Sequence, residues 1–271
     1  MPPEVALTVV GSANLDLVAR VERLPRPGET LTDAEFFTAP GGKGANQAVG
    51  AARLGARVRF VGAVGRDSFA EEALSGLREA GCDLDVVEVD TPTGVAVIYV
   101  DGSGENTIVV APGANGLVEP AEPEGAVLCQ LEIPLPAVET AASKASFFCL
   151  NAAPAKPVAV GLVRRADLVV VNRYELEALP ETPRLTALTL GDEGAVLLEQ
   201  GEEVARAAPP RVDAVDGTAA GDAFTACLVV SLLEGRSREE ALTRACKAGA
   251  LAASRPGAQP SLPTAEDVDA L

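Results

Sequence analysis

Apolar runs bounded by glycine or polar residues recur along the chain. The run at residues 5–10 ends at Gly11, which is the pattern of a buried strand. Runs of the same kind lie at residues 58–64, 126–131, 146–150, 168–171 and 185–190. Helical spacing of apolar residues is found at 45–54 and 68–80, and each of these segments ends at a glycine. This alternation predicts an α/β fold, with a doubly wound, mostly parallel sheet and helices on both faces.

Other segments have the pattern of antiparallel hairpins. Residues 93–100 and 106–111 are β-rich and flank the turn sequence Asp101-Gly102-Ser103-Gly104. Residues 30–39 have weaker strand character, and a further hairpin is predicted at residues 194–198 and 203–208. A hairpin inserted among βα units predicts a small antiparallel sheet. We expect a single α/β domain over residues 1–271, with a β-sheet lid drawn from about residues 15–40 and 93–112.

Polar side chains follow the predicted strands at their carboxyl ends. Asn14 and Asp16 follow the first strand, and later strands are followed by Glu132, Asn151, Asn172 with Glu175, and Gly191 with Gly194. Each residue taken alone has a structural alternative as a turn former or capping residue. Because ligands bind at the carboxyl edge of open α/β sheets, the repetition predicts an active edge.

A glycine cluster, Gly41-Gly42-Lys43-Gly44-Ala45-Asn46-Gln47, opens the first predicted helix. It is not a Walker A motif, since no Ser or Thr follows a Gly-Lys pair, and its spacing differs from a dinucleotide fingerprint. An NAD-dependent oxidoreductase is therefore disfavoured. Lys43 and Asn46 are hydrogen-bond donors, and Asp16 is an acceptor. Together these side chains predict a site for a polyol.

A second cluster of small residues, Asp216-Gly217-Thr218-Ala219-Ala220-Gly221-Asp222, directly precedes an apolar helix at residues 223–233. Unpaired N–H groups and the helix dipole make such a helix start an anion site. A carboxylate beside it suits phosphoryl transfer, in which the acid accepts the proton of the attacking hydroxyl. The structural alternative is that Asp222 only stabilises the dipole. A helix at 239–253, a turn at 255–261 and a short helix from Thr264 complete the chain.

Composition and charge restrict the function further. The chain has 271 residues, a net charge of −17 and no histidine. The acidic charge argues against a nucleic-acid partner, and the lack of histidine excludes His-based triads and metal sites. We expect no membrane span, because no apolar stretch is long enough, and no signal peptide, because residues 1–10 lack a basic region. Five scattered cysteines suit reduced thiols in a cytoplasmic protein.

Taken together, these motifs resemble the ribokinase-like family of sugar and nucleoside kinases. The matching segments occur in family order at residues 11–16, 41–48, 130–132, 172–175, 189–191, 216–222 and 257–261. The resemblance implies ATP-dependent phosphorylation of D-ribose at its 5-hydroxyl by direct in-line transfer. It also implies Mg²⁺ and a monovalent cation such as K⁺ as cofactors. The alternatives are a kinase for another small sugar or nucleoside, such as deoxyribose, fructose or adenosine, and a non-catalytic sugar-binding relative.

The resemblance implies roles for individual residues. Asp222 would be the general base, and the transferring phosphoryl would face the N–H groups of Ala219, Ala220, Gly221 and Asp222. The sugar would be held by Asn14, Asp16, Gly42, Lys43, Asn46, Glu132 and Asp222. The ATP site would include Asn172, Glu175, Thr189, Gly191, Gly194, Gly221 and the helix around Cys246. Glu175 would meet Mg²⁺ through water, and the monovalent cation would lie among Asp216, Thr218, Ala252, Arg255, Gly257 and Ser261.

The chain departs from the family pattern in places. Gly217 stands where the family usually has threonine, so a side-chain contribution to the cation or anion loop is lost there. The connections at residues 116–127 and 179–185 are too short for the helices that the family usually carries. The resemblance also implies a homodimer formed through the lid strands, whose edges would be exposed.

Overall fold

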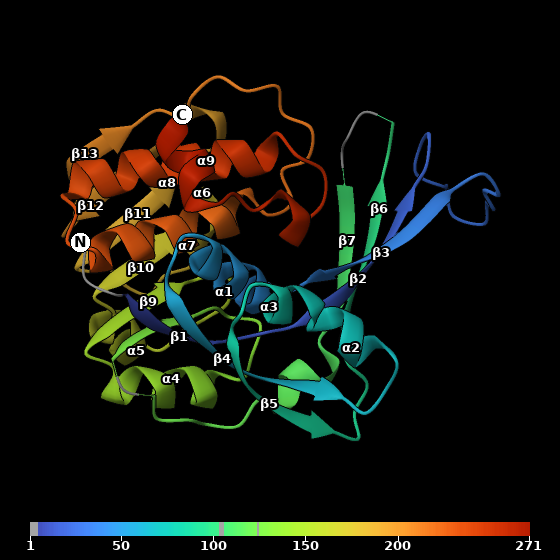
Figure 1. Cartoon of the computed structure of the whole chain (residues 1–271), viewed down its shortest axis with the longest axis horizontal. Helices are drawn as coiled ribbons and strands as arrows, with labels where there is room; N and C mark the ends of the chain where they lie inside the picture. Colours follow the sequence, from blue (N-terminus) through green and yellow to red (C-terminus); the bar gives the residue numbers. More distant parts are fainter. Residues whose placement is uncertain (1–4, 103–105, 124) are drawn as a thin grey trace.

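The computed structural model describes residues 5–102, 106–123 and 125–271, and a large sheet is its central element (Figure 1). The strand order is β13-β12-β11-β10-β9-β8-β1-β4-β5. All neighbours from β5 to β11 are parallel, whereas β12 and β13 are antiparallel. The strands are β1 Ala6–Val10, β4 Arg57–Gly65, β5 Asp83–Val89, β8 Ala126–Cys129, β9 Phe147–Asn151, β10 Leu168–Val171, β11 Leu185–Thr189, β12 Ala195–Glu199 and β13 Glu202–Ala207. The predicted mostly parallel sheet is confirmed.

Helices cover both faces of this sheet, as predicted (Figure 1). One face carries α1 Lys43–Arg53, α7 Ala220–Leu233 and α8 Arg238–Ala253, whose apolar side chains share one core cluster. The other face carries α4 Leu135–Lys144, α5 Val160–Arg165 and the 3-10 helix η1 Gly113–Leu117. Helix α7 is buried continuously from Asp222 to Ser231. It is apolar on all sides because α1 and α8 also pack against it.

The remaining helices are short. They are α2 Phe69–Ala73, α3 Ser75–Glu79, α6 Arg173–Glu177, α9 Ala265–Ala270, η2 Gly191–Glu193 and η3 Gln259–Ser261. The single helix expected at 68–80 is thus two helices. The Ser75 hydroxyl donates to the Glu72 carbonyl at 2.8 Å, a local bond that competes with helical pairing where the helix breaks. No helix in the described part of the chain has both the length and the apolar character needed to cross a membrane.

A second sheet forms the lid, with the order β3-β2-β6-β7. Its strands are β2 Asn14–Arg20, β3 Glu35–Gly41, β6 Gly94–Val100 and β7 Asn106–Ala111. The outer pairs are antiparallel, and the central pair β2–β6 is parallel. The predicted hairpin is confirmed, although Ser103 and Gly104 of its turn lie outside the described residues. The lid projects from one side of the main sheet (Figure 1), and Asn14 and Asp16 begin one of its strands.

The strand order places a crevice at β1. From β1 the chain proceeds to β4 and β5 on one side and later returns to β8 on the other side of β1. Ligands in doubly wound folds bind outside the carboxyl ends of the strands at such a switch point. The segments that follow β1 and β8 contain Asn14, Asp16 and Glu132. The fold therefore brings the predicted sugar-side residues to one place.

The two connections that looked too short do lack helices. Described residues between Leu117 and Ala126 form neither helix nor strand, and the same holds between Glu177 and Leu185. Helix α6, only five residues long, is the sole helix between β10 and β11.

Candidate active site

Asp222 lies in the first turn of α7 with only 5% of its surface exposed. Its Oδ2 accepts a hydrogen bond from Asn46 Nδ2 at 2.9 Å, and its Oδ1 accepts one from Gln47 Nε2 at 2.8 Å. Both donors belong to α1. The N-terminal turns of the two helices therefore meet at this carboxylate.

The start of α7 is left open for a ligand. Ala219 is the N-cap and makes no side-chain cap, because alanine has no acceptor. A Cβ added to Gly221 would meet no atom within 4 Å. Of the three residues predicted here, Ala219 is fully buried and the Ala220 N–H already donates to the Gly217 carbonyl at 3.2 Å, whereas Gly221 is exposed. The first turn is therefore open to an anion mainly at Gly221.

The glycine cluster brings α1 against the segment that follows β1. Gly42 caps α1 with φ +88°, a conformation that side chains disfavour. A Cβ on Gly44 would lie 2.5 Å from the backbone nitrogen of Ser12, so only glycine permits this approach. Lys43, between these two glycines, is the first residue of α1. The cluster therefore fixes where α1 begins, and with it the positions of Lys43, Asn46 and Gln47.

A pocket of about 140 Å³ lies beside Asp222. Among the predicted site residues it is lined by Lys43, Asn172, Glu175, Thr189, Thr218, Gly221 and Asp222. The rest of its lining consists of Asn151, Ala153, Val170, Val171 and Thr225. Residues from α1, α6 and α7 therefore converge on one small, polar space. No aromatic side chain lines it.

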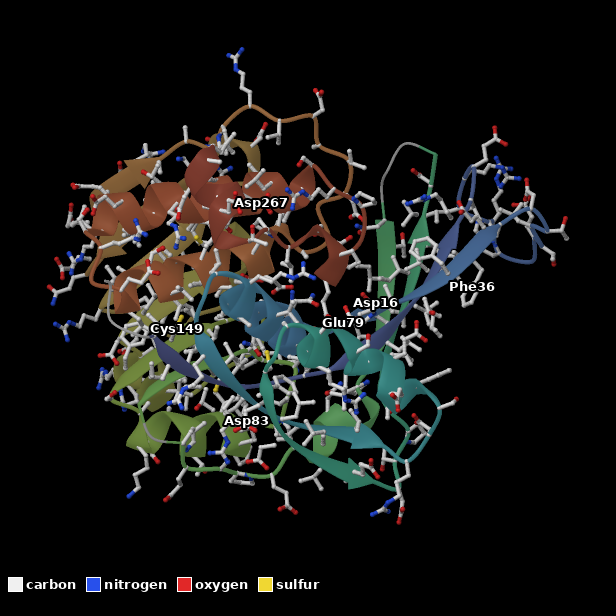
Figure 2. All side chains as sticks on the ribbon, viewed as in Figure 1. Asp16, Phe36, Glu79, Asp83, Cys149 and Asp267 are labelled. Atoms are coloured by element: carbon white, nitrogen blue, oxygen red, sulfur yellow. The ribbon has the colours of Figure 1, made fainter. Side chains whose placement is uncertain are left out.

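Of the residues predicted to hold the sugar, Lys43 and Asp222 line this pocket, whereas Asn14, Asp16, Gly42, Asn46 and Glu132 do not. Glu132 Oε2 accepts bonds from Ser12 Oγ at 2.6 Å and from the Lys43 N–H at 3.0 Å. Asp16 is 5% exposed and lies opposite Ala96 in the β2–β6 pairing, so it faces the same side as the apolar lid residues. Figure 2 shows Asp16 at the base of the lid. Sugar-side and phosphate-side residues thus meet at Asp222.

Asn14 is held by a residue that the sequence did not single out. Asn115 Nδ2 donates to Asn14 Oδ1 at 2.6 Å, and Asn115 Oδ1 accepts the Ala13 N–H at 2.9 Å. Asn115 is 1% exposed. With its oxygen engaged by Asn115, the Asn14 side chain has its amide N–H groups left as donors. The sequence gives no signal for this contact, because Asn115 follows the lid hairpin and lies 101 positions from Asn14.

Burial and the neighbouring charges shift the pKa values of the ionisable groups in the site. Burial, followed by the Glu132 and Asp222 carboxylates, raises the pKa of Asp16 to about 7. Burial also raises the pKa of Asp222, although Lys43 and the amides of Asn46 and Gln47 oppose it. Burial would lower the pKa of Lys43, yet the surrounding carboxylates raise it, so Lys43 is the fixed cation here.

Some of the residues predicted for the nucleotide line the pocket, and others lie outside it. Asn172 and Glu175 form a capping box at α6: Asn172 Oδ1 accepts the Glu175 N–H at 2.9 Å, and Glu175 Oε2 accepts the Asn172 N–H at 2.8 Å. These residues and Thr189 line the pocket. Gly194 has φ +93°, and a Cβ there would lie 2.1 Å from the Ala207 carbonyl oxygen. Its position in the fold thus requires glycine for packing.

Neither Gly191 nor Cys246 lines the described pocket. Gly191 has φ +65° and open space around a Cβ. Cys246 is 4% exposed, and its Sγ points to the Ala207 carbonyl at 3.6 Å. The five cysteines are free, and four of them are buried.

Three of the residues predicted around the monovalent cation, Asp216, Thr218 and Gly257, contact one another. Asp216 Oδ1 accepts bonds from the N–H, at 3.0 Å, and the hydroxyl of Thr218, and Oδ2 accepts the Gly257 N–H at 2.9 Å. Burial opposes ionisation of Asp216, but these bonds lower its pKa overall. Arg255 pairs with Asp267 at 3.2 Å. Of the other two members of the set, Ala252 lies near the end of α8 and the buried Ser261 ends η3.

A doubly wound sheet with a β-lid, and a polar pocket where a buried acid meets a lysine, define an α/β phosphotransferase acting on a small polar molecule. The model of the "pfkB family carbohydrate kinase" matches residues 6–265. The chain therefore belongs to the pfkB family of carbohydrate kinases and is a kinase.

Similar proteins agree with this assignment. Ribokinase of Bacillus subtilis (strain 168) is 37% identical, with 98% of each chain covered. The crystal structure of ribokinase from Thermotoga maritima has a TM-score of 0.87 and 32% identity, with 98% of each chain covered. Arabidopsis thaliana ribokinase, solved in complex with ribose and ATP, has a TM-score of 0.81 and 31% identity over 100% of this chain and 98% of that one.

We expect protonation of Asp16 to weaken sugar binding. Ionised Asp16 would accept hydrogen bonds from sugar hydroxyls, and its pKa of about 7 means that this form is lost as the pH falls through 7. Sugar affinity, measured by calorimetry between pH 5 and 9, should be level at high pH. Below pH 7 it should fall by up to about tenfold per pH unit. Asp16→Asn should bind weakly without this dependence, and a level wild-type profile would contradict the assignment.

Proposed function

We propose that the chain transfers the γ-phosphoryl group of ATP to the 5-hydroxyl of D-ribose, with Asp222 as general base. One observation carries this proposal: the buried Asp222 carboxylate lies at the open N-terminus of α7, in a pocket shared with Lys43. A base and an anion site therefore adjoin each other, which is what transfer of a phosphoryl group to an alcohol requires.

The sugar would be held on the lid side of Asp222. Asp16 and Glu132 would accept hydrogen bonds from its hydroxyls, and Asn14, Lys43 and Asn46 would donate. Gly42 would contribute through its backbone, because its Cβ position lies against the protein itself, 2.9 Å from the Asn14 nitrogen. This arrangement would direct one primary hydroxyl to the Asp222 carboxylate.

In the reaction, the sugar oxygen would attack the γ-phosphorus as its proton passes to Asp222. The new oxygen–phosphorus bond forms as the bond to the β-phosphate oxygen breaks, and ADP leaves. The N–H groups among residues 219–222 that have no partner, which excludes that of Ala220, and the α7 dipole would stabilise the charge on the phosphoryl oxygens. Lys43 would add a fixed positive charge beside them.

The residues present fit the cations that the family resemblance implies. Among the described residues there is no group of three or more metal-binding side chains, which suits a Mg²⁺ ion that keeps most of its waters. Glu175 would hold it through water, and bound Mg²⁺ would neutralise phosphate charge. Asp216 stays ionised, and Arg255 is neutralised by Asp267, so a monovalent cation would meet net negative charge at that turn.

D-ribose is preferred over a nucleoside on the composition of the site. The described pocket and the sugar-side residues offer no aromatic ring on which a base could stack. We expect phosphorylation of D-ribose to exceed that of deoxyribose, fructose and adenosine, measured as ADP release with each acceptor at equal concentration. A higher kcat/KM with any of the other three would replace D-ribose as the substrate.

Replacing Asp222 by asparagine removes the base while keeping the shape of the side chain. We expect Asp222→Asn to fold normally and to lose about 10²- to 10⁴-fold in kcat, with a modest change in sugar affinity. The measurement is steady-state turnover with D-ribose and ATP, with circular dichroism to verify the fold. Asp213→Asn, an exposed acid nearby, is the matched control. Turnover of Asp222→Asn near that of the control would refute the base.

We also propose a homodimer through the lid. Every residue of β7 is exposed, with Val109 62% exposed, and Phe36 on β3 is 64% exposed. Figure 2 shows Phe36 on the outer part of the lid. An edge strand with apolar, exposed side chains is a pairing surface.

The dimer predicts a solution mass of twice the 27.6 kDa of one chain, measured by light scattering. Val109→Glu should reduce it to that of one chain, since a charge cannot be buried there without a partner. Val87→Glu, at a 51% exposed valine of β5 in the main sheet, should leave the dimer intact. A single-chain mass for the wild type would exclude the proposal.

A further inference from the structure

Asp222 rests on a buried network of side-chain amides. Gln47 and Gln130 are 0% exposed, and Asn151 is 6% exposed. Gln47 Nε2 donates both to Asp222 Oδ1 and to Asn151 Oδ1, at 2.8 Å each. Gln130 Nε2 donates to Gln47 Oε1 at 2.6 Å, and Asn151 Nδ2 donates to the Val170 carbonyl at 3.1 Å. These residues come from α1, from the segment after β8 and from β9.

The direction of every bond in this network follows from one backbone group. The Val170 carbonyl can only accept, so it fixes Asn151 with its nitrogen toward β10 and its oxygen toward Gln47. That oxygen requires a donor, which must be Gln47 Nε2. Gln130 then donates to Gln47 Oε1 from the other side. Gln47 is therefore held as a donor to Asp222 and cannot turn its oxygen to the carboxylate.

Two buried oxygens without partners support the same directions. Asn46 Oδ1 and Gln130 Oε1 have no hydrogen-bond partner among the described residues. A buried acceptor without a donor is costly, and rotation of either amide would change which atom is left alone. Rotated, Asn46 would direct its oxygen at Asp222, and Gln130 would direct its oxygen at Gln47. In the observed orientation of the amides, both Asn46 and Gln47 direct N–H groups at the Asp222 carboxylate.

We propose that Gln47 is a positioning residue that keeps Asp222 unprotonated and aimed at the sugar hydroxyl, with Gln130 and Asn151 holding Gln47 in its donor orientation. This inference rests on the proposed role of Asp222 as the base. Gln47 touches neither sugar nor nucleotide in this scheme. It acts only through the carboxylate.

The charges around Asp222 explain why neutral donors are needed. The Lys43 cation favours the ionised carboxylate, whereas three acids repel its negative charge: Asp16, Glu132 and Glu175. Burial acts in the same direction as these acids. Amide N–H groups favour the ionised form without bringing a titratable proton of their own. A second cation in place of Gln47 would compete for the phosphates.

The test is the pH profile of Gln47→Met, which keeps the length of the side chain and removes the donor. The single-turnover rate of phosphoryl transfer is measured at saturating D-ribose and ATP, so that the titration of Asp16 does not enter. We expect the acid limb of the profile to move to higher pH by about one to two units, with the rate recovering at high pH. A merely structural role would lower the rate at all pH values and leave the limb in place.

Matched variants isolate the effect. Thr186→Val, another buried polar change in the main sheet, should leave the profile unchanged. Gln130→Met removes the lock on Gln47 but not the donor, so it should move the limb in the same direction by less. Its own oxygen has no partner, so this variant loses no bond there and serves as the test if Gln47→Met does not fold.

The outcomes separate this inference from the proposed function. An inactive Asp222→Asn together with shifted limbs in Gln47→Met and Gln130→Met supports it. An inactive Asp222→Asn with an unshifted limb in Gln47→Met, or in Gln130→Met where only that variant folds, overturns the role of Gln47 alone. Activity near the wild-type level in Asp222→Asn overturns the base, and this inference falls with it.

Discussion

The structure depends on the burial of one carboxylate between two helix starts. Asp222 is nearly inaccessible, yet both of its oxygens accept bonds from α1. For those donors to reach it, α1 must begin against the backbone of Ser12, which only the glycine cluster allows. Helix α7 must also lie inside the molecule, and its apolar sequence provides for that. The position of Asp222 thus depends on two segments that are far apart in the sequence, the glycine cluster before α1 and helix α7.

The charges near this carboxylate present a second constraint. Lys43 is the one cation among the pocket-lining side chains, and three acids act on it, Asp222, Glu132 and Glu175. The chain as a whole carries −17. A polyphosphate therefore cannot be attracted by net charge. In the proposed function, local features would hold it, namely the first turn of α7, Lys43 and a divalent cation, and these would act at short range where burial strengthens them.

Continuous apolar runs and glycine stops were sufficient to predict the buried strands and the helices α1, α7 and α8. Strand β5 was missed because it lies at the sheet edge and alternates acids with apolar residues, which weakens the signal. Helix α4 was missed because prolines at its start resemble a turn. The site motifs were visible locally, but Gln47 was not interpreted, since its partner Asp222 lies 175 positions away. Pairings of that kind follow from the tertiary fold alone.

A chain without histidine must obtain its base from another side chain, and an exposed aspartate is a weak base at neutral pH because its pKa is low. Burial raises the pKa of Asp222 and so would strengthen it in the proposed role of base, but too large a rise would leave it protonated and unable to accept a proton. The opposing influences of Lys43, Asn46 and Gln47 limit that rise. A neutral amide network suits this purpose better than further charges, because it tunes the acid and leaves the phosphate side of the pocket unaltered.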